Sequence, residues 1–253
     1  MSETMIRMLL ERIQHETGII LSRQTDYDRI KRYLDNGGEM PLTSQPLPVS
    51  LINLVTTNET YFEREAHHFN RLMDEILPKL DSRGGTKPIR ILSAPCSSGE
   101  ESYTIALRLL QASKQFSRPI EIVGVDISEE MISKARKGIY SGRSVHAIDK
   151  EVLNRFFVFE EGHYRVLPLV QENVRFVSGN VFDAALWKEL GSFDVIFSRN
   201  MMIYFDSVKN RELLNRFREH LNGYLILGHA DDHRNAKDLF TPERIERGVI
   251  YHT

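Results

Sequence analysis

Cysteine is almost absent from this chain, which has Cys96 as its single example among 253 residues. One cysteine excludes a disulfide within the chain and any metal site built from several thiolates. No apolar stretch reaches the roughly 20 residues that a transmembrane helix needs, and the N-terminus lacks the charged and apolar regions of a signal peptide. We therefore expect a soluble, cytoplasmic protein with no membrane insertion and no metal ion.

Excess charge of either sign is also missing, because the formal net charge is only −2. A general nucleic-acid binder would need a broad basic surface, so we expect no nucleic-acid partner. Two phosphate-binding patterns, G-x-G-x-x-G and G-x-x-x-x-G-K-[ST], do not occur, which weakens dinucleotide and P-loop interpretations. The 41% hydrophobic content is enough for a substantial core. We expect a monomer.

A turn of small residues lies between a predicted strand and a predicted helix. Residues 89–92 are typical of a short buried strand, residues 94–99 form a turn with little side-chain bulk, and helical spacing follows. Such a turn lets a ligand approach backbone amides at the carboxyl end of a strand. Glu100 and Glu101 would repel a phosphate there. They suit S-adenosylmethionine, which has a ribose, an ammonium and a sulfonium but no phosphate.

Polar residues end three further predicted strands: Asp126, Asn180 and Asn200. A carboxylate at the second strand end can accept hydrogen bonds from ribose hydroxyls, and an amide at the third could read an adenine edge. Each residue taken alone is as easily a helix cap or turn residue. Because all three follow strand ends in register after the small-residue turn, we favour a ligand site.

Alternating strands and helices from residue 89 onward predict an α/β fold with a parallel sheet and right-handed crossovers. We expect residues 1–50 to form a short N-terminal helical domain with a linker, and residues 51–253 to form the α/β domain. A β-hairpin of residues 155–159 and 164–167 indicates an inserted β-subdomain at about residues 141–172. We also expect a helix ending near Asp81, a helix capped by Asp206 and an antiparallel edge strand at residues 249–252.

The chain resembles the chemotaxis receptor glutamate O-methyltransferase family, called CheR, over about residues 50–253. The resemblance rests on TNETYFEREAHHF at residues 57–69, SAPCSSGEESY at residues 93–103, Asp126, and SRNMMIYF at residues 198–205. It implies a Rossmann-like S-adenosylmethionine-dependent methyltransferase that methylates glutamate side chains of chemoreceptor cytoplasmic domains. The cofactor-binding residues implied are Asn58, Thr60, Arg64, Ala94, Glu101, Asp126, Asn180, Val181, Asn200 and Met201. Arg64 and Tyr204 are the implied catalytic residues, beside the reacting methyl group.

The implied reaction fits the lack of a catalytic His–Asp or Cys–His arrangement. A glutamate has a pKa of about 4.3, so its ionised carboxylate attacks the methyl group without a general base. Its negative charge and the positive charge of the sulfonium both disappear, which a dry pocket does not penalise. Arg64 would orient the incoming carboxylate.

Several residues allow a plainer interpretation. Cys96 is better explained as small filler in the turn than as a nucleophile, and His67 and His68 are adjacent, so they cannot chelate one metal together. Met202, with Met201, is expected in the pocket wall and core. His229 stands at a strand end and could border the pocket.

The sequence also departs from the family patterns. Glu63 replaces an aromatic residue, Ser102 replaces a proline, and GHAD at residues 228–231 replaces GHSE. The family's N-terminal domain has a basic helix that docks on the receptor, whereas here only residues 29–32 are locally basic. Those basic residues either supplement substrate contact or are a solvated helix face.

Some relatives grip a peptide tether at the receptor's C-terminus with a longer hairpin loop. Here the loop of residues 160–163 is short and holds two acids, which would repel an acidic tether or a free C-terminal carboxylate. We therefore expect recognition that does not depend on the tether pentapeptide. Two alternatives stay open: a sensor or scaffold that binds the cofactor without transfer, and a methyltransferase acting on a non-receptor protein.

Overall fold

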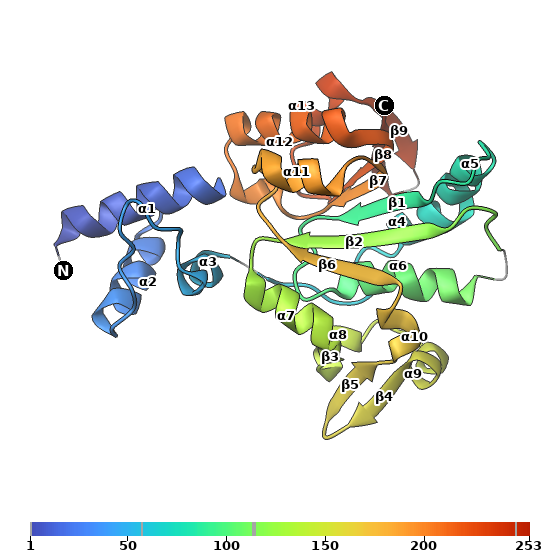
Figure 1. Cartoon of the computed structure of the whole chain (residues 1–253), viewed down its shortest axis with the longest axis horizontal. Coiled ribbons are helices and arrows are strands. Elements are labelled where there is room, and N and C mark those ends of the chain that lie inside the picture. Colours follow the sequence, from blue (N-terminus) through green and yellow to red (C-terminus); the bar gives the residue numbers. More distant parts are fainter. Residues whose placement is uncertain (1, 57, 113–114, 246) are drawn as a thin grey trace.

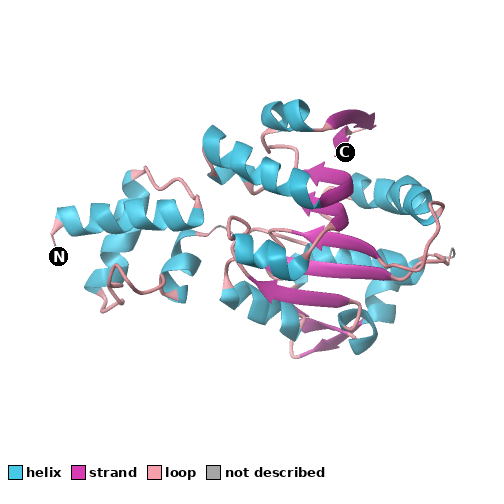
Figure 2. Ribbon diagram, turned by 45° about the horizontal axis from the view of Figure 1, so that its top comes forward, coloured by secondary structure: helices cyan, strands magenta, loops and turns pink. Residues whose placement is uncertain are grey.

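The computed structural model describes residues 2–56, 58–112, 115–245 and 247–253. Thr57, which begins the first family motif, lies outside these residues. A seven-stranded sheet in the order β6-β2-β1-β7-β8-β10-β9 is covered by helices on both faces (Figures 1 and 2). Its strands are β1 (Ile89–Ser93), β2 (Ile120–Asp126), β6 (Val174–Ser178), β7 (Phe193–Ser198), β8 (Leu221–Leu227), β9 (Thr241–Ile245) and β10 (Gly248–His252).

The five strands from β6 to β8 pair in parallel, and β10 runs antiparallel to both β8 and β9. The strand order reverses at β1, since β2 lies on one side of it and β7 on the other. In open α/β sheets this is where ligands bind. The predicted α/β, Rossmann-like architecture is confirmed.

Side chains alternate between the two faces of the sheet, as the strand geometry requires. On one face Ile91, Ile122 and Val195 pack against α4 (His67–Arg71), the π-helical η1 (Leu72–Ile76), α5 (Leu77–Asp81), α6 (Glu100–Gln111) and α7 (Glu129–Lys137). On the other face Leu92, Val123 and Ile196 pack against α11 (Ala184–Leu190), α12 (Ser207–His220) and α13 (His233–Leu239). Both faces are buried, so the parallel strands are almost continuously apolar.

Two of the predicted helix boundaries are confirmed. The run α4–η1–α5 ends at Asp81. The Asp206 carboxylate caps α12 by accepting a hydrogen bond from the backbone N–H of Lys209 at 2.8 Å. Capping of this kind satisfies a backbone donor that has no partner inside the helix.

Three helices form the N-terminal unit: α1 (Glu3–Thr17), α2 (Gln24–Asp35) and α3 (Val49–Val55). They extend from one side of the sheet domain (Figure 1) and share a core that includes Ile13, Ile30 and Leu51. The proposed division at residue 50 stays a prediction, although α3 packs into this N-terminal core. None of the described helices is long and apolar enough to cross a membrane.

The predicted hairpin forms a small separate sheet below the main sheet in Figure 1. Its strands are β3 (Ile139–Tyr140), β4 (Phe157–Glu160) and β5 (His163–Val166), in the order β3-β5-β4, with α8 (Gly142–Val145), α9 (Lys150–Phe156) and α10 (Pro168–Gln171) around them. The expected first strand began two residues too early, because Arg155 and Phe156 complete helix α9. The subdomain sheet also recruits β3, just before the expected start at residue 141.

The C-terminal edge corrects a second prediction. Residues 249–252 do form an antiparallel strand within β10, but β9 covers it, so β10 is not the edge strand. The edge strand β9 contains Pro242, which is tolerated at an edge where no further strand needs its N–H.

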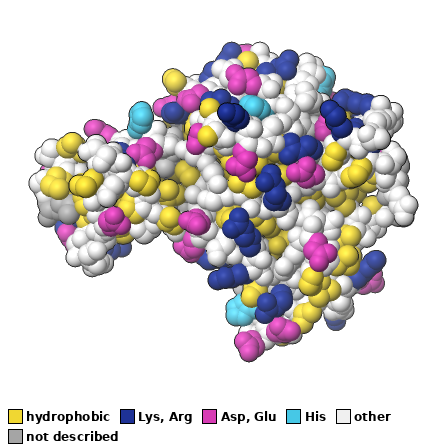
Figure 3. Space-filling model, viewed as in Figure 1, with side chains coloured by type: hydrophobic (Ala, Val, Ile, Leu, Met, Phe, Trp, Pro, Cys, Tyr) yellow, Lys and Arg dark blue, Asp and Glu magenta, His cyan; other side chains and the backbone are white. Residues whose placement is uncertain are grey.

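On the visible surface, basic and acidic side chains are interspersed (Figure 3).

Candidate functional site

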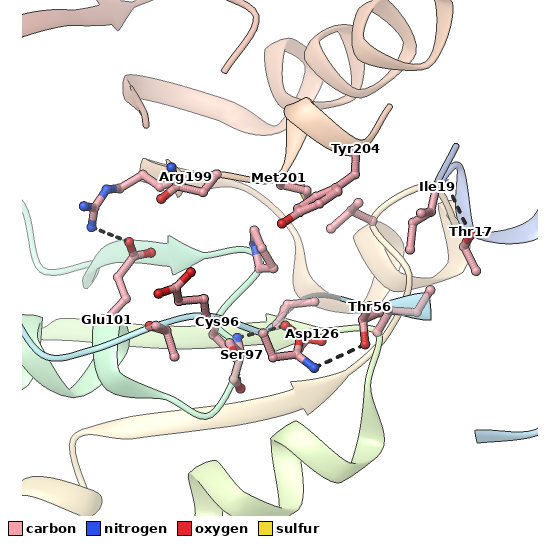
Figure 4. Close-up of a pocket in the computed structure, with 18 of the residues that line it drawn as sticks. Thr17, Ile19, Thr56, Cys96, Ser97, Glu101, Asp126, Arg199, Met201 and Tyr204 are labelled. Atoms are coloured by element: carbon pink, nitrogen blue, oxygen red, sulfur yellow. Dashed lines mark hydrogen bonds and ion pairs between the residues drawn. The ribbon is translucent and has the colours of Figure 1, made fainter. Parts of the chain in front are cut away.

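A cleft lies at the carboxyl ends of the parallel strands, where the strand order reverses. It contains about 1040 Å³ of space free of protein atoms, part of it open to solvent. In Figure 4, Glu101 and Arg199 lie at one end, and Thr17 and Ile19 lie at the other. This volume is of the size that small-molecule and cofactor sites have.

The turn after β1 forms the floor of the cleft, with Cys96 and Ser97 facing it. The Cys96 N–H donates to the Val125 carbonyl at 2.8 Å, so the turn is fixed to the end of β2. Gly99 follows with a φ of 96°, and a Cβ there would lie 2.9 Å from the Cβ of Ala135. Glycine is required by both constraints. Burial raises the pKa of the Cys96 thiol well above its usual value, which favours the filler interpretation.

Asp126 ends β2 and is only 4% exposed. Its carboxylate accepts the backbone N–H groups of Ser97 at 2.8 Å and Ser128 at 2.9 Å. Burial raises its pKa, while these N–H donors oppose the rise. Within the described residues no lysine or arginine pairs with Asp126. Since a carboxylate has about four acceptor positions, it can still receive ribose hydroxyls, and a cationic ligand would compensate its charge.

Arg199, at the end of β7, links three parts of the cleft wall. Its guanidinium donates to Glu65 Oε2 at 2.7 Å and to Glu101 Oε2 at 2.7 Å, and it also bonds the Arg64 carbonyl. Ser93 Oγ donates to the other Glu101 oxygen at 2.8 Å. The Arg199 side chain is only 2% exposed, and its buried charge is paired with both carboxylates. This role of Arg199 was not predicted from the sequence, although Arg199 lies within the SRNMMIYF motif.

The loop after β7 is held by Asp231, the acid of the GHAD segment. The Asp231 carboxylate accepts the N–H groups of Asn200 at 2.7 Å, Met202 at 2.9 Å and Gly228 at 2.8 Å. Asn200 has a left-handed φ of 59°, which asparagine tolerates better than most residues. The shorter acid in place of the family's glutamate is therefore a structural anchor for the loop that carries Asn200 and Met201.

The N-terminal unit forms the far end of the cleft, a contact that was not predicted from the sequence. Thr17 and Ile19 line the cleft directly. Asn180 Nδ2 donates to the Glu16 carbonyl at 2.7 Å, and the Ile20 N–H donates to the Tyr204 carbonyl at 2.8 Å. Asn180 Oδ1 accepts the Phe182 N–H at 3.0 Å. Each end of the Asn180 amide thus has one partner within the protein and one position left, so its contact with an adenine edge stays a prediction.

The segment carrying the first family motif forms another wall. Arg64 Nη1 donates to the Glu59 carbonyl at 2.7 Å, and the guanidinium carbon lies 6.0 Å from the centre of the Tyr61 ring. Glu63, the residue that departs from the family pattern, pairs with Arg108 of α6 at 2.6 Å. The substitution therefore serves to fasten this segment to α6, and it leaves Arg64 on the cleft wall.

The structure brings together every predicted site residue except Ala94. The residues that line the cleft are Asn58, Thr60, Arg64, Glu101, Asp126, Asn180, Val181, Asn200, Met201 and Tyr204. Ala94 is fully buried, and its N–H donates to the Phe197 carbonyl at 2.9 Å, so it lies outside this lining. Glu100 also turns away: it is 2% exposed and accepts a hydrogen bond from Ser98 Oγ at 2.7 Å. Only Glu101 of the two acids reaches the cleft.

The histidine that was expected to border the pocket lies outside the cleft. His229 does not line the cleft but a neighbouring cavity, together with His67 and His68. Across the residues that the structure describes, no group of three or more His, Cys, Asp or Glu side chains is arranged to hold a metal ion.

The fold and the cleft define a class, the Rossmann-like S-adenosylmethionine-dependent methyltransferases. The residues of the cleft fit this cofactor. The turn after β1 is built of small residues and is not a P-loop. The acid at the end of β2, Asp126, has no cationic partner among the described residues. Residues 58–249 match the model of the CheR methyltransferase S-adenosylmethionine-binding domain. The chain belongs to the CheR methyltransferase family, and its cofactor is S-adenosylmethionine.

Relatives with known names agree with this assignment. The chain is 37% identical to chemotaxis protein methyltransferase 2 of Vibrio cholerae over 207 residues, covering 80% of this chain and 72% of the relative. It is 35% identical to the chemotaxis protein methyltransferase of Borreliella burgdorferi, covering 76% and 70%. Among solved structures, magnesium protoporphyrin IX methyltransferase from Synechocystis with bound S-adenosylmethionine is 14% identical, with a TM-score of 0.40, covering 98% of this chain and 94% of that one.

Proposed function

We propose that this protein transfers a methyl group from S-adenosylmethionine to glutamate side-chain carboxylates of chemoreceptor cytoplasmic domains. The observation that carries the proposal is the chemistry of the cleft wall. Its described lining includes the cation Arg64 and no histidine or lysine, and Cys96 there keeps its proton. Such a lining suits an acceptor that is already an anion and needs no general base.

Arg64 is the cation available to such an acceptor. Arg199 also lines the cleft, but four of its five N–H groups already donate to Glu65, Glu101 and the Arg64 carbonyl. Arg64 donates from one nitrogen to the Glu59 carbonyl, and no acid among the described residues forms an ion pair with Arg64. It would hold the acceptor glutamate in place by charge-assisted hydrogen bonds, and Tyr204 would border the reacting atoms.

Asp126 and the turn of residues 95–97 would hold the adenosine part of the cofactor. When bound, the cofactor would supply an electrophilic methyl on its sulfonium. An ionised carboxylate oriented by Arg64 would accept that methyl as an ester without proton transfer, and S-adenosylhomocysteine would be left. The Arg199 side chain, only 2% exposed, would present little water-accessible charge on this side of the cleft. A dry site favours a reaction in which opposite charges disappear.

The receptor would be recognised without a C-terminal tether. The β4–β5 hairpin turns at Glu161 and Gly162 and is short and acidic. In the N-terminal unit, Arg29 donates to the Leu54 carbonyl at 2.9 Å and Lys31 pairs with Asp35, so much of the basic segment is used internally. Direct contact between the cleft face and the receptor's cytoplasmic domain would therefore carry recognition, in the cytoplasm and by a monomer.

The test is methyl transfer from isotope-labelled S-adenosylmethionine to a panel of receptor cytoplasmic fragments. We expect label on glutamates, located by mass spectrometry and released as methanol by mild alkali, as a methyl ester requires. Alkali-stable label would indicate another acceptor atom. Cofactor binding without any transfer would favour a sensor or scaffold, and transfer only to other proteins would favour a non-receptor substrate.

A further inference from the structure

A second cavity lies beside the cofactor cleft and plays no part in the reaction described above. It contains about 810 Å³ of space free of protein atoms, part of it open to solvent. Four of its lining residues are histidines. The lining consists of Glu65, His67, His68, Leu227, His229, His233, Arg247, Gly248 and Val249.

The cavity and the cleft are neighbours at the same edge of the sheet. The cleft is lined by Arg199, Asn200 and Met201 after β7, whereas the cavity is lined by Leu227 and His229 at the end of the adjacent strand β8. One segment forms a wall of both, because residues 64 and 69 line the cleft and residues 65, 67 and 68 line the cavity. A single segment of chain therefore separates the cleft at Arg64 from the histidine-lined cavity.

Glu65, the acid in the described cavity lining, is already hydrogen-bonded within the protein. Glu65 Oε2 accepts two hydrogen bonds from Arg199, at 2.7 and 3.2 Å, and Oε1 accepts the backbone N–H of His229 at 3.3 Å. The His233 ring is also hydrogen-bonded within the protein, through Nδ1 to the Tyr251 hydroxyl at 2.9 Å and through Nε2 to the Gly228 carbonyl at 3.1 Å. Glu65 and His233 therefore have partners within the protein and shape the cavity wall.

Groups that suit an anion remain available. Throughout the described part of the chain, neither the exposed Arg247 nor the His229 ring has a hydrogen-bond or ion-pair partner. His68 is 3% exposed and lines the cavity, yet its Nδ1 makes no hydrogen bond with any described residue; the Glu65 carboxylate is 3.9 Å away. A buried polar atom left without a partner is unusual and points to a ligand that supplies one.

We propose that this cavity binds a second carboxylate of the protein substrate, carried by an acidic side chain close to the glutamate that is methylated. This inference rests on the proposed function. Arg247 supplies the charge at the rim, and the His229 and His68 rings supply hydrogen-bond partners inside. On a helix, side chains three or four positions apart are neighbours, so one helical substrate can present one acid to the cleft and another to the cavity.

The test is a binding experiment that needs no turnover. The protein, with histidines labelled by carbon-13 at Cε1 and saturated with S-adenosylhomocysteine, is titrated with alanine-based helical peptides. One peptide has glutamates four positions apart; its matched partner has one glutamate and one alanine. We expect the ring signals of His68 and His229 to shift saturably with the first peptide and not with the second.

Two variants locate the contact. Because charge-assisted hydrogen bonds are the stronger ones, Arg247→Gln should weaken binding of the two-glutamate peptide about tenfold and leave the one-glutamate peptide unaffected. Arg244→Gln is the matched control, since it removes the same charge from the same β9–β10 hairpin but does not line the cavity. His229→Ala is a second variant, expected to reduce the preference for the first peptide.

Different results would contradict the second carboxylate site and the proposed function. Unchanged His68 and His229 signals, or equal losses in Arg247→Gln and Arg244→Gln, would overturn the inference even if the wild-type protein methylates receptor fragments. The expected shifts in a protein that transfers no methyl to receptor fragments would support the second carboxylate site and refute the proposed substrate. Equal shifts with inorganic phosphate alone would show a general anion site and overturn the commitment to an acidic side chain.

Discussion

The side-chain amide of Asn180 donates a hydrogen bond to the backbone carbonyl of Glu16 at 2.7 Å, across 164 positions of sequence. Asn180 belongs to the cofactor cleft, and Glu16 belongs to the last turn of α1. The bond places the next residues, Thr17 and Ile19, in the cleft wall. The N-terminal unit is therefore part of the cofactor site rather than an appendage to it.

From this contact we expect Asn180→Ala to weaken binding of S-adenosylhomocysteine about fivefold, because the hydrogen bond contributes about 1 kcal/mol and its loss loosens one cleft wall. Calorimetry measures the affinity. Asn173→Ala is the matched control: Asn173 donates to the Leu169 carbonyl at 2.7 Å, away from the cleft. Equal affinities of both variants would contradict a role for the α1 contact.

Asp126 gives a second prediction about affinity. Asp126→Ala should weaken binding of S-adenosylmethionine and S-adenosylhomocysteine by at least tenfold, since each charged hydrogen bond contributes roughly 1.5–3 kcal/mol. The variant also frees the Ser97 and Ser128 N–H groups, so thermal unfolding must show that it is folded. Unchanged affinity in a folded variant would rule out the ribose assignment.

How much of the fold could be predicted from the sequence depends on how far apart in the sequence the contacting residues lie. The turn of residues 94–99, Asp126 and Asn200 follow strands with strong apolar periodicity, so their shared edge was predictable. Strand β9 was missed because Thr241–Ile245 contains Pro242 and two charged residues and has little apolar alternation. Only its pairing with β10 makes it a strand.

In the candidate site, too, residues within local motifs were predictable, whereas residues placed by contacts between distant segments were not. Residues inside the motifs, such as Arg64 and Met201, do line the cleft. Thr17 and Ile19 carry no local signal, since they reach the cleft only through docking of α1. Asp231 was noted as a departure from the family pattern, but its three backbone partners lie on two separate loops, which no local pattern reveals.

Turnover should be more sensitive than affinity to changes at Arg64 and Tyr204. We expect Arg64→Ala and Tyr204→Phe to lower kcat with a receptor fragment by at least tenfold and to change cofactor affinity by less than about threefold, because positioning of the acceptor acts on the chemical step. Steady-state kinetics and calorimetry together separate the two effects. Full turnover in either variant with the native substrate removes that residue from the catalytic set.

Stability should depend on pH through His68. Burial, followed by the charge of Arg199, lowers the His68 pKa from 6.5 to about 3. The unfolded chain takes up this proton below about pH 6.5, whereas the native protein does not until about pH 3, so stability present above pH 6.5 is lost as the pH falls through that window.

Between pH 7.5 and 5.5 the wild-type protein should therefore lose about 1 kcal/mol more unfolding free energy than His68→Leu, which has no proton to gain. Urea unfolding at the two pH values measures the difference. His68→Gln, which is polar but does not titrate, should follow the leucine variant. Parallel losses in all three proteins would show that His68 is protonated in the native state as readily as in the unfolded chain.

The β-subdomain hairpin leads to a prediction about receptor recognition. Its turn at Glu161 and Gly162 is only two residues long, and Glu160 precedes it. An acidic tether peptide or its free C-terminal carboxylate would meet like charges there, which costs affinity and slows association. We expect no binding of a C-terminal tether pentapeptide up to millimolar concentration, measured by calorimetry, and equal methylation of receptor fragments with and without the tether. Micromolar binding that disappears when the hairpin of residues 157–166 is replaced would show that the short acidic turn does accept the tether.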